Sequence, residues 1–462
     1  MLIEFTVENY RSFKELTKLS MQSTKIVDLP EHSVNVDVGS NSLAINKLGV
    51  FFGSNAAGKS NMLRAFEHMR TLVVKLGIPK KERTDFLTSD YDPFRFSTDS
   101  RQAPTLFQSI YEVHGTYFRY GFIYDSKEII EEWLYSGTFD DENKIFIRYS
   151  DKTIEYGDAA HISDIKNAEK YLNGKNLLLS VGADLKIAFC EKAISFFISI
   201  VLQFPHSMPL AILLEKQEFL PIVSSLLAFA DTGISNIESR KRKSPELEIP
   251  EDVPDAVAKL FEAMKALVKE QEENMSAVMF RHSGLDGEDP ELALLPEEQE
   301  SRGTLTFITL LFRLCLAIQR DSVVVVDELD NGLHPLLVAG ILKFFTSIPG
   351  SKAQLLCSSH CSVIFSREIV RRDELWITEK DIDGQSVLIS ASDYKDARSD
   401  GNLTRRYLEG RFGGVPLLDS KYFEEGRRAT IQMLATRHLN QQEIPITTDM
   451  RNGPTSEVEH GS

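Results

Sequence analysis

Within residues 2–13, Ile3, Phe5 and Val7 alternate with Glu4 and Thr6, and this period of two predicts a half-buried strand. A continuous apolar run over 47–53 ends in glycine and predicts a second, more deeply buried strand. From Asn61 onward the apolar residues recur at helical spacing. Alternation returns over 104–149, where residues 114–115 predict a hairpin tip, so we expect an antiparallel sheet there.

The middle of the chain has a different pattern. Helix-forming residues dominate from about 160 to 280, and the apolar residues of 253–274 gather on one helical face. The polar segment 239–254 predicts an exposed linker between helices. Strand and helix patterns resume from 304 to about 380, and the polar tail from about 440 predicts frayed or disordered residues.

The length of 462 residues is enough for roughly three domains of ~150 residues. Hydrophobic residues make up 42% and charged residues 26% of the chain, which is typical of a soluble globular protein. No stretch approaches ~18 consecutive apolar residues, and the N-terminal strand does not resemble a signal peptide. We therefore expect a cytoplasmic protein with four free thiols, at Cys190, Cys315, Cys357 and Cys361.

The net charge is −16, from 52 basic and 68 acidic residues. A protein that grips nucleic acid over its whole surface is usually basic, so this balance favours protein partners. Local basic patches remain candidates for nucleic acid at residues 240–243 and at Arg371 and Arg372, with solvated surface charge as the alternative.

The segment Gly53–Ser60 has the Walker A pattern Gly-x-x-x-x-Gly-Lys-Ser, with a predicted strand before it and a helix after it. Glycines let successive backbone N–H groups turn toward phosphate, and a helix N-terminus adds its positive dipole end. Lys59 would reach the β and γ phosphates of ATP, and the Ser60 hydroxyl would bind Mg²⁺. The predicted nucleotide-binding residues are Gly53, Ser54, Asn55, Ala56, Ala57, Gly58, Lys59, Ser60 and Asn61.

Four valines at 323–326 predict a buried strand that ends directly in Asp327 and Glu328. Carboxylates at this place are costly unless a cation neutralises them. We expect this Walker B strand to lie beside the P-loop strand, so that Asp327 and Ser60 hold Mg²⁺. Glu328 would then polarise the water that attacks the γ phosphate.

A further apolar run ends at His360. Together, Cys357, His360 and Cys361 could instead mark a zinc site, but a fourth ligand and a paired knuckle are not visible. The order strand–Asp–Glu–loop–helix–strand–His resembles that of the ABC-type ATPases. This resemblance implies that His360 contacts the γ phosphate.

Two more segments resemble ABC-type ATPases. Asp330 stands where an Asp-containing loop crosses the dimer interface of those enzymes, and His334 is interpreted as a structural residue at a helix start. Ser301 and Gly303 precede an apolar helix over 305–319, in the place of the Ser-x-Gly signature that binds the γ phosphate held by the opposite subunit. The alternative for this stretch is a plain helix cap.

Two features depart from the ABC pattern. Glu300 and Arg302 replace the usual Leu and first Gly of the signature. No glutamine stands clearly in a Q-loop, for which Gln108 is the candidate. The acidic residues of 379–383 invite comparison with a Toprim nuclease, but too few residues follow them, and we interpret this stretch as a β-hairpin turn.

Taken in order, these motifs resemble the compact ABC/SMC-related ATPases of bacteria, whose heads RecF-like and OLD-like proteins share. Segment 393–416 contains Tyr-Leu-x-Gly-Arg-Phe-Gly-x-x-Pro and resembles the ending of the RloA/AbiLi-like ATPases, relatives of the AriA ATPase of the PARIS system. The resemblance implies an ATPase of anti-phage defence (abortive infection) that senses a phage component and controls a partner effector, such as a Toprim-like or other nuclease. The alternative is a RecF/SMC-like ATPase of DNA repair or recombination.

We therefore expect an α/β fold: an ABC-type P-loop ATPase head, with a mixed sheet and an antiparallel β subdomain, and an inserted α-helical subdomain. The implied ligands are ATP and Mg²⁺, and the implied partners are a second copy of the chain in a head-to-head dimer and a protein effector, with no membrane. The predicted divisions are 1–159 with Walker A and the antiparallel subdomain, 160–285 as a helical insertion for partner binding or assembly, 286–420 with the signature, Walker B and H-loop, and 421–462 as a C-terminal helix and polar tail.

Overall fold

The structure is a computed structural model, and the residues that it describes form two compact units, within 1–415 and 416–462. The predicted helix at 253–274 and the tail from 443 lie outside the described residues. The described residues are 1–38, 41–78, 87, 90–138, 140–151, 153–157, 162–202, 210, 216–241, 276–282, 294–394, 402–416 and 419–442.

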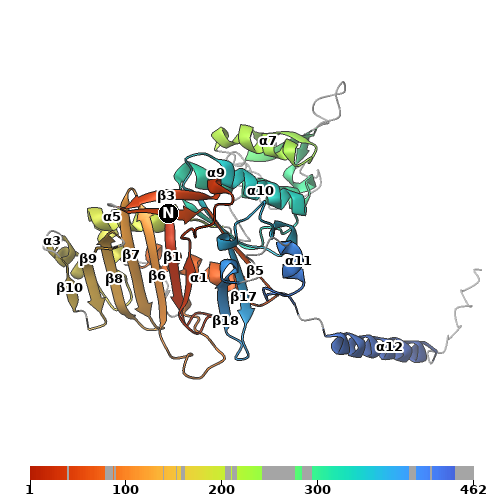
Figure 1. The fold of residues 1–462 in the computed structure, drawn as a ribbon, viewed down its shortest axis with the longest axis horizontal. Coiled ribbons are helices and arrows are strands. Elements are labelled where there is room, and N and C mark those ends of the chain that lie inside the picture. Colours follow the sequence, from red (N-terminus) through yellow and green to blue (C-terminus); the bar gives the residue numbers. More distant parts are fainter. Residues whose placement is uncertain are drawn as a thin grey trace, which may run out of the picture. The chain divides into compact units, whose positions relative to one another are not determined.

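A six-stranded sheet carries the predicted P-loop strand at its centre (Figure 1). All neighbouring strands pair in parallel except the last two, which form an antiparallel hairpin. Its central strands are buried along their whole length, as their continuous apolar runs predict. In sheet order the strands are β11 (Val201–Leu202), β15 (Val323–Val326), β16 (Gln354–Ser358), β5 (Leu48–Gly53), β17 (Leu375–Lys380) and β18 (Ser386–Ser390).

The prediction that the Walker B strand lies directly beside the P-loop strand is wrong. Strand β16, which ends just before His360, lies between β15 and β5. Both prediction and structure place the ends of β15 and β5 at the same edge, because all three strands run in parallel. The interposed strand therefore brings its own terminal residues between the two motifs.

Alternate residues of this sheet face two different cores, because successive side chains of a strand point to opposite faces. Phe51 faces the core that contains α1 (Lys59–Lys75). Val50 and Phe52 face the other core. That second core also contains buried residues of two helices, α9 (Arg302–Arg320) and α10 (Pro335–Ser347).

A seven-stranded antiparallel sheet packs on the other side of α1, so that this helix lies between the two sheets (Figure 1). This confirms the predicted N-terminal strand and the antiparallel pattern of 104–149. The hairpin tip falls at His114 and Gly115, which have φ angles of 48° and 75°. In sheet order the strands are β10 (Ile154–Tyr156), β9 (Glu142–Tyr149), β8 (Ile129–Gly137), β7 (Thr116–Tyr124), β6 (Thr105–Val113), β1 (Leu2–Glu8) and β2 (Thr17–Ser20).

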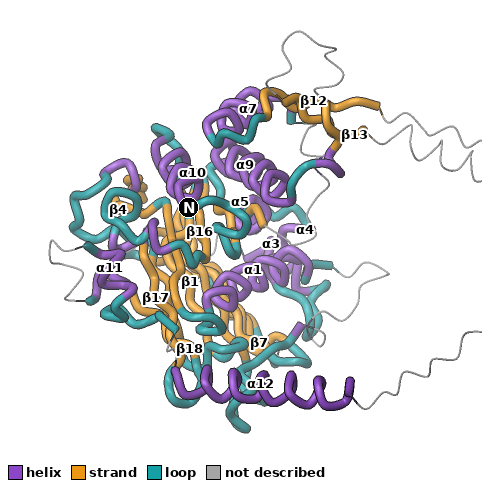
Figure 2. Tube along the Cα trace, turned by 90° about the vertical axis from the view of Figure 1, so that its right-hand side faces the viewer, coloured by secondary structure: helices purple, strands orange, loops and turns teal. Residues whose placement is uncertain are grey.

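The first half of the predicted insertion is helical and packs on the antiparallel sheet (Figure 2). Phe196 stacks on Tyr111 with ring centroids 4.3 Å apart. These helices therefore complete the core of that sheet, and the proposed division at residue 159 stays a prediction. They are α3 (Ile162–Glu169), α4 (Leu178–Asp184) and α5 (Ala188–Ser199).

The second half contains strands that the sequence pattern did not predict. A three-stranded sheet has the order β12 (Ile234–Lys241), β13 (Ser276–His282) and β14 (Leu294–Pro296). The predicted linker is therefore wrong for residues 239–241. A bulge near the start of β12 makes Ile234 and Ile237 both buried, three residues apart, which hides the period of two.

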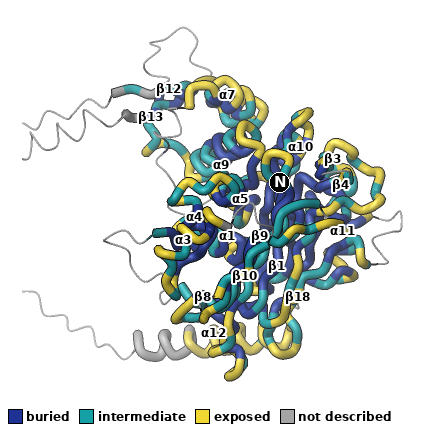
Figure 3. Tube along the Cα trace, turned by 90° about the vertical axis from the view of Figure 1, so that its left-hand side faces the viewer, coloured by how far each residue is buried: buried dark blue, intermediate teal, exposed yellow. Residues whose placement is uncertain are grey.

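The other described elements are short or lie at the periphery. Figure 3 shows exposed residues on the outer side of α7 (Leu220–Phe229), which packs on α9. The remaining elements are η1 (Pro30–His32), β3 (Ser33–Val38), β4 (Asn41–Asn46), η3 (Gln217–Phe219), η4 (Glu297–Gln299), η5 (Ser362–Ile364), η6 (Arg372–Glu374), η7 (Ala391–Asp393), α11 (Leu403–Leu408) and, in the second unit, α12 (Ser420–Gln442).

Helix α9 is long and apolar enough to cross a membrane by length and composition, alone among the described helices. Half of its apolar window is buried inside the protein. Its buried residues, such as Leu311 and Leu314, belong to the same core as Val50 and Phe52 of β5. This packing is that of a core helix.

Candidate nucleotide-binding site

The predicted P-loop joins the buried end of β5 to the start of α1. Gly58 has φ 120°, and a Cβ placed there would lie 2.2 Å from the Ser386 Oγ atom. Only glycine fits this turn without a shift of its neighbours. The loop therefore delivers the N-terminus of a 17-residue helix to the edge of the sheet, which is the geometry that binds phosphate.

Lys59 lies buried across this loop. Its Nζ atom donates to the backbone oxygens of Gly53 at 2.9 Å and Ser54 at 3.1 Å. Burial lowers the pKa of Lys59, and the nearby carboxylates, Asp327 first among them, oppose that shift. The lysine is thus the positive group near the carboxylates that end the Walker B strand.

Asp327 joins the two nucleotide motifs. One oxygen of its half-buried carboxylate, Oδ1, accepts hydrogen bonds from Ser60 Oγ at 2.9 Å and from Ser358 Oγ at 2.6 Å. A hydroxyl and a carboxylate oxygen side by side are the hard donors that Mg²⁺ prefers. With Lys59 and the loop amides nearby, these residues fit ATP–Mg²⁺.

Glu328 has a left-handed backbone, with φ 55°. This conformation costs a residue other than glycine about 1–2 kcal/mol, so neighbouring groups must hold it. Its N–H donates to Ser358 Oγ at 2.7 Å, and the next N–H, from Leu329, donates to the Ser358 carbonyl oxygen at 2.9 Å. The Glu328 side chain is exposed, where it can contact a water molecule.

Asp330 and His360 are also brought together. The backbone N–H of His360 donates to both Asp330 carboxylate oxygens, each at 3.1 Å. The His360 residue is exposed at the same sheet edge as Glu328, because β15 and β16 are parallel neighbours. The candidate D-loop and H-loop residues are therefore fixed to one another.

Ser301 and Gly303 lie at the start of α9. Ser301 is the N-cap of the helix, since its Oγ accepts from the Thr304 N–H at 3.0 Å. A Cβ on Gly303 would lie 2.9 Å from the oxygen of Gly332, so the candidate signature packs closely on the segment after Asp330. Ser301 is exposed.

Three sequence interpretations concern neighbouring residues. His334 is the N-cap of α10, and its Nδ1 accepts from the Leu336 N–H at 3.3 Å, which confirms its structural reading. The acidic stretch at 379–383 runs from the end of β17 into the turn of the β17–β18 hairpin, as predicted. Arg371 does not form a surface patch, because it is buried in an ion pair with Asp373 at 2.9 Å.

Gln108, the candidate for the Q-loop, lies in β6 of the antiparallel sheet. Its Oε1 accepts hydrogen bonds from Trp133 Nε1 at 3.1 Å and from Arg119 at 3.5 Å. The structure thus places it in a side-chain network of that sheet.

Sequence reasoning missed a set of hydroxyl groups behind the P-loop. Ser386 Oγ donates to the Ala57 oxygen at 2.6 Å and shares a hydrogen bond of 2.8 Å with Ser12 Oγ, and Asn61 Nδ2 donates to the same Ser12 Oγ at 2.8 Å. These serines come from both ends of the chain. No local pattern marks them, and only the fold brings them to the loop.

Glu67 lies on α1, two turns beyond Ser60. Burial raises the pKa of Glu67 to about 7, and the charge of Asp327 adds to the shift. At neutral pH this group is therefore close to half protonated, next to a site that carries several carboxylates.

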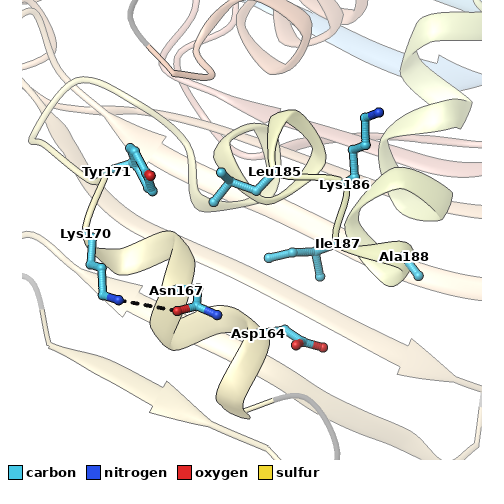
Figure 4. Close-up of a pocket in the computed structure, with 8 residues that line it drawn as sticks. All are labelled: Asp164, Asn167, Lys170, Tyr171, Leu185, Lys186, Ile187 and Ala188. Atoms are coloured by element: carbon cyan, nitrogen blue, oxygen red, sulfur yellow. Dashed lines mark hydrogen bonds between the residues drawn. The ribbon is translucent and has the colours of Figure 1, made fainter.

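A separate cavity of about 570 Å³ opens between α3 and the start of α5 (Figure 4). Lys170 Nζ donates to Asn167 Oδ1 at 3.4 Å on its α3 side. The cavity contains none of the predicted site residues and is not part of the P-loop site. It is lined by Asp164, Asn167, Lys170, Tyr171, Leu185, Lys186, Ile187 and Ala188.

The parallel sheet with a P-loop at its edge, and the Walker B carboxylates beside it, define a P-loop ATPase of the ABC type. The family described as "AAA domain, putative AbiEii toxin, Type IV TA system" matches residues 49–366, more than half of the chain. The chain belongs to this family, whose AAA domains are nucleotide-hydrolysing ATPases.

Solved structures with similarity to the chain include SMC heads. The SMC head domain from Thermotoga maritima is 13% identical, with 84% of this chain and 98% of that chain covered at a TM-score of 0.39. An SMC head bound to the C-winged helix domain of ScpA is 12% identical, with coverages of 84% and 97% and a TM-score of 0.39. No curated protein matches the sequence.

Proposed function

We propose that this protein is an ATP-driven switch that binds ATP–Mg²⁺ and hydrolyses it slowly between two copies of the chain. The observation that carries the proposal is the hydrogen-bonded connection from Ser60 through Asp327 and Ser358 to Glu328. It brings the Walker A loop, a paired hydroxyl and carboxylate, and an exposed carboxylate to one sheet edge. That combination serves phosphoryl transfer to water.

The chain's own residues divide the chemistry among them. Lys59 would leave its two backbone acceptors and neutralise the β and γ phosphates, while the loop amides bind the phosphate oxygens. Ser60 and Asp327 would hold Mg²⁺, which supplies charge neutralisation at the phosphates when bound. Glu328 would orient the attacking water, and His360 would contact the γ phosphate.

The second copy completes the site in this proposal. Ser301 and Gly303 are at an exposed helix N-terminus, which suits an anion held by another subunit. The close contact of Gly303 with Gly332 would let Asp330 and the signature move together. Closure would then depend on the γ phosphate, so ATP and ADP would give different assemblies.

The cellular role proposed here is anti-phage defence in the cytoplasm. The resemblance of 393–416 to RloA/AbiLi-like ATPases supports it, and the family's description as a putative toxin of a type IV toxin–antitoxin system points in the same direction. The switch would sense a phage component and control a protein effector, such as a nuclease. The acidic chain, with net charge −16, favours a protein partner over nucleic acid.

Titration calorimetry with ATP in the presence of Mg²⁺ tests the proposal. The protein should bind ATP, and Lys59→Ala should abolish binding because the lysine charge on the phosphates is lost. Lys75→Ala, the same change at the exposed far end of α1, is the matched control and should bind normally. Absence of ATP binding by the folded wild-type protein would refute the proposal.

A further inference from the structure

The segment 402–415, here called the clamp segment, carries a sequence motif whose part in the molecule is so far unexplained. It contains α11 and the turns after it, and it packs through aromatic rings. Phe412 is fully buried against Phe365, with centroids 5.3 Å apart. Tyr407 stacks on Phe365 at 4.8 Å and meets Phe52, the last residue before the P-loop, edge-on at 5.5 Å.

The clamp segment also touches the backbone of Gly53, where the P-loop begins. The Tyr407 hydroxyl donates to the Gly414 backbone oxygen at 3.4 Å. A Cβ on Gly414 would lie 3.2 Å from Gly53 Cα and 2.9 Å from Ile377, so the two backbones are in close contact.

A carboxylate at the end of β17 holds this contact. Glu379 Oε1 accepts the Gly414 N–H at 2.7 Å. Gly413 and Gly414 have φ angles of 65° and 67°, and a Cβ on Gly413 would lie 1.5 Å from Glu379 Oε1. Two consecutive glycines are therefore required for the chain to pass between Glu379 and Gly53.

We propose that the clamp segment is part of the ATP site, and that Tyr407 and Glu379 are positioning residues for the P-loop. Gly53 pairs with Thr378 of β17 and lies against the backbone of Gly414, to which the Tyr407 hydroxyl donates. Fixing the first residue of the loop fixes the direction of the amides that follow and bind phosphate. The inference rests on the proposed binding of ATP.

The coupling between ATP binding and docking of the clamp segment is reciprocal. If docking of the clamp segment favours ATP, then ATP must favour docking of the clamp segment by the same factor. A clamp segment that only stabilises the fold would show no such response. Nucleotide occupancy would thus be felt just before Pro416, where the second compact unit of the chain begins.

Tyr407→Phe tests the proposal, because it removes the hydroxyl and keeps the ring packing on Phe365. ATP affinity measured by calorimetry should fall about fivefold, the effect of one lost hydrogen bond of ordinary net strength, here the bond from the Tyr407 hydroxyl to the Gly414 oxygen. Tyr394→Phe is the matched control: it is the same change in the same aromatic cluster, on a ring that packs against Phe412. Its ATP affinity should match the wild type.

A second pair of variants distinguishes loss of the contact with Gly414 from a folding defect. Glu379→Ala should weaken ATP binding as Tyr407→Phe does, and Glu379→Gln, which keeps an acceptor oxygen for Gly414, should restore most of it. In the wild type, a non-hydrolysable ATP analogue should slow hydrogen exchange of the amides at 412–415, and Tyr407→Phe should reduce that protection.

Two different outcomes would overturn this inference and the proposed ATP-binding function, respectively. If the wild type binds ATP but folded Tyr407→Phe and Glu379→Ala bind it within about twofold of wild type, with no exchange response at 412–415, the inference is overturned. If the folded wild type binds no ATP at all, the proposed function itself is overturned.

Discussion

Ser358→Ala should slow ATP hydrolysis while leaving ATP binding nearly unchanged. The hydroxyl is buried and does two things at once: it donates to Asp327 Oδ1 at 2.6 Å and accepts the Glu328 N–H at 2.7 Å. Its removal costs a hydrogen bond to a charged group, about 1.5–3 kcal/mol, and leaves the Glu328 N–H without that acceptor. A water molecule entering the vacated space would offset part of this loss.

The expected fall in kcat follows from the two hydrogen bonds that Ser358 makes with Asp327 and Glu328. If about 1.4–2.7 kcal/mol of positioning is lost from the transition state, kcat falls about 10- to 100-fold. The KM for ATP should change by no more than about threefold, because Lys59 and the loop amides are untouched. Steady-state phosphate release at saturating Mg²⁺ measures both parameters.

Ser359→Ala is the control for this experiment. Ser359 is the next residue and equally buried, but its Oγ accepts the Cys361 N–H at 3.0 Å and caps the following turn. It should keep kcat near that of the wild type. A folded Ser358→Ala protein with kcat within about twofold of wild type would refute the idea that Ser358 positions Asp327 and Glu328.

Three further predictions concern the interface, the pH dependence and the partner. Ser301→Arg should abolish hydrolysis and leave ATP affinity near normal, measured by phosphate release and calorimetry; full activity of this variant would exclude a signature contact in trans. Glu67 has its pKa raised from 4.5 to about 7, so its contribution to stability is full below pH 4.5 and is lost as the pH rises through 7. Urea unfolding of the nucleotide-free protein should therefore show Glu67→Gln stabler than wild type by up to about 3 kcal/mol at pH 8, with the difference shrinking toward pH 5; a constant difference would contradict this. Replacing 242–275 with an Asn-Gly turn should keep ATP binding, because the paired ends of β12 and β13 allow a tight hairpin. The same change should abolish effector co-purification or higher assembly. If ATP binding, co-purification and assembly all persist, this segment is not the partner element.

The nucleotide motifs could be predicted from the sequence because each is a contiguous pattern with one physical cause. Gly53 to Ser60 form a single loop, and Asp327 follows four buried valines directly. A short contiguous segment of sequence is enough to predict both the burial of the strand and the need for a cation at the carboxylate that follows it. The same holds for the hairpin at His114 and the N-cap at His334.

What sequence reasoning missed depends on contacts between distant segments. The order of parallel strands is set by packing, so the position of β16 between β15 and β5 has no local signal. Consequently the part that Ser358 plays beside Asp327 could not be foreseen. Ser12, Ser386 and Glu379 are ordinary surface-like residues in the sequence, and only the fold brings them to the P-loop or the clamp segment.

Strands β12 and β13 were missed for a different reason. The bulge in β12 places two buried isoleucines three residues apart, which imitates helical spacing within a region rich in helix formers. The segment that separates β12 from β13 also hides their pairing, because no tight-turn sequence directly joins the two strands.

The central claim is that ATP closes two copies of this chain around a shared site. Glu328→Gln should bind ATP–Mg²⁺ without hydrolysing it, because the carboxylate that orients water is neutral. Light scattering after size exclusion should then show this variant as a monomer, or as a smaller assembly, without nucleotide, and as a stable dimer or a multiple of dimers with ATP but not with ADP. A Glu328→Gln protein that binds ATP and stays monomeric, while the wild-type monomer hydrolyses ATP at full rate, would contradict the account.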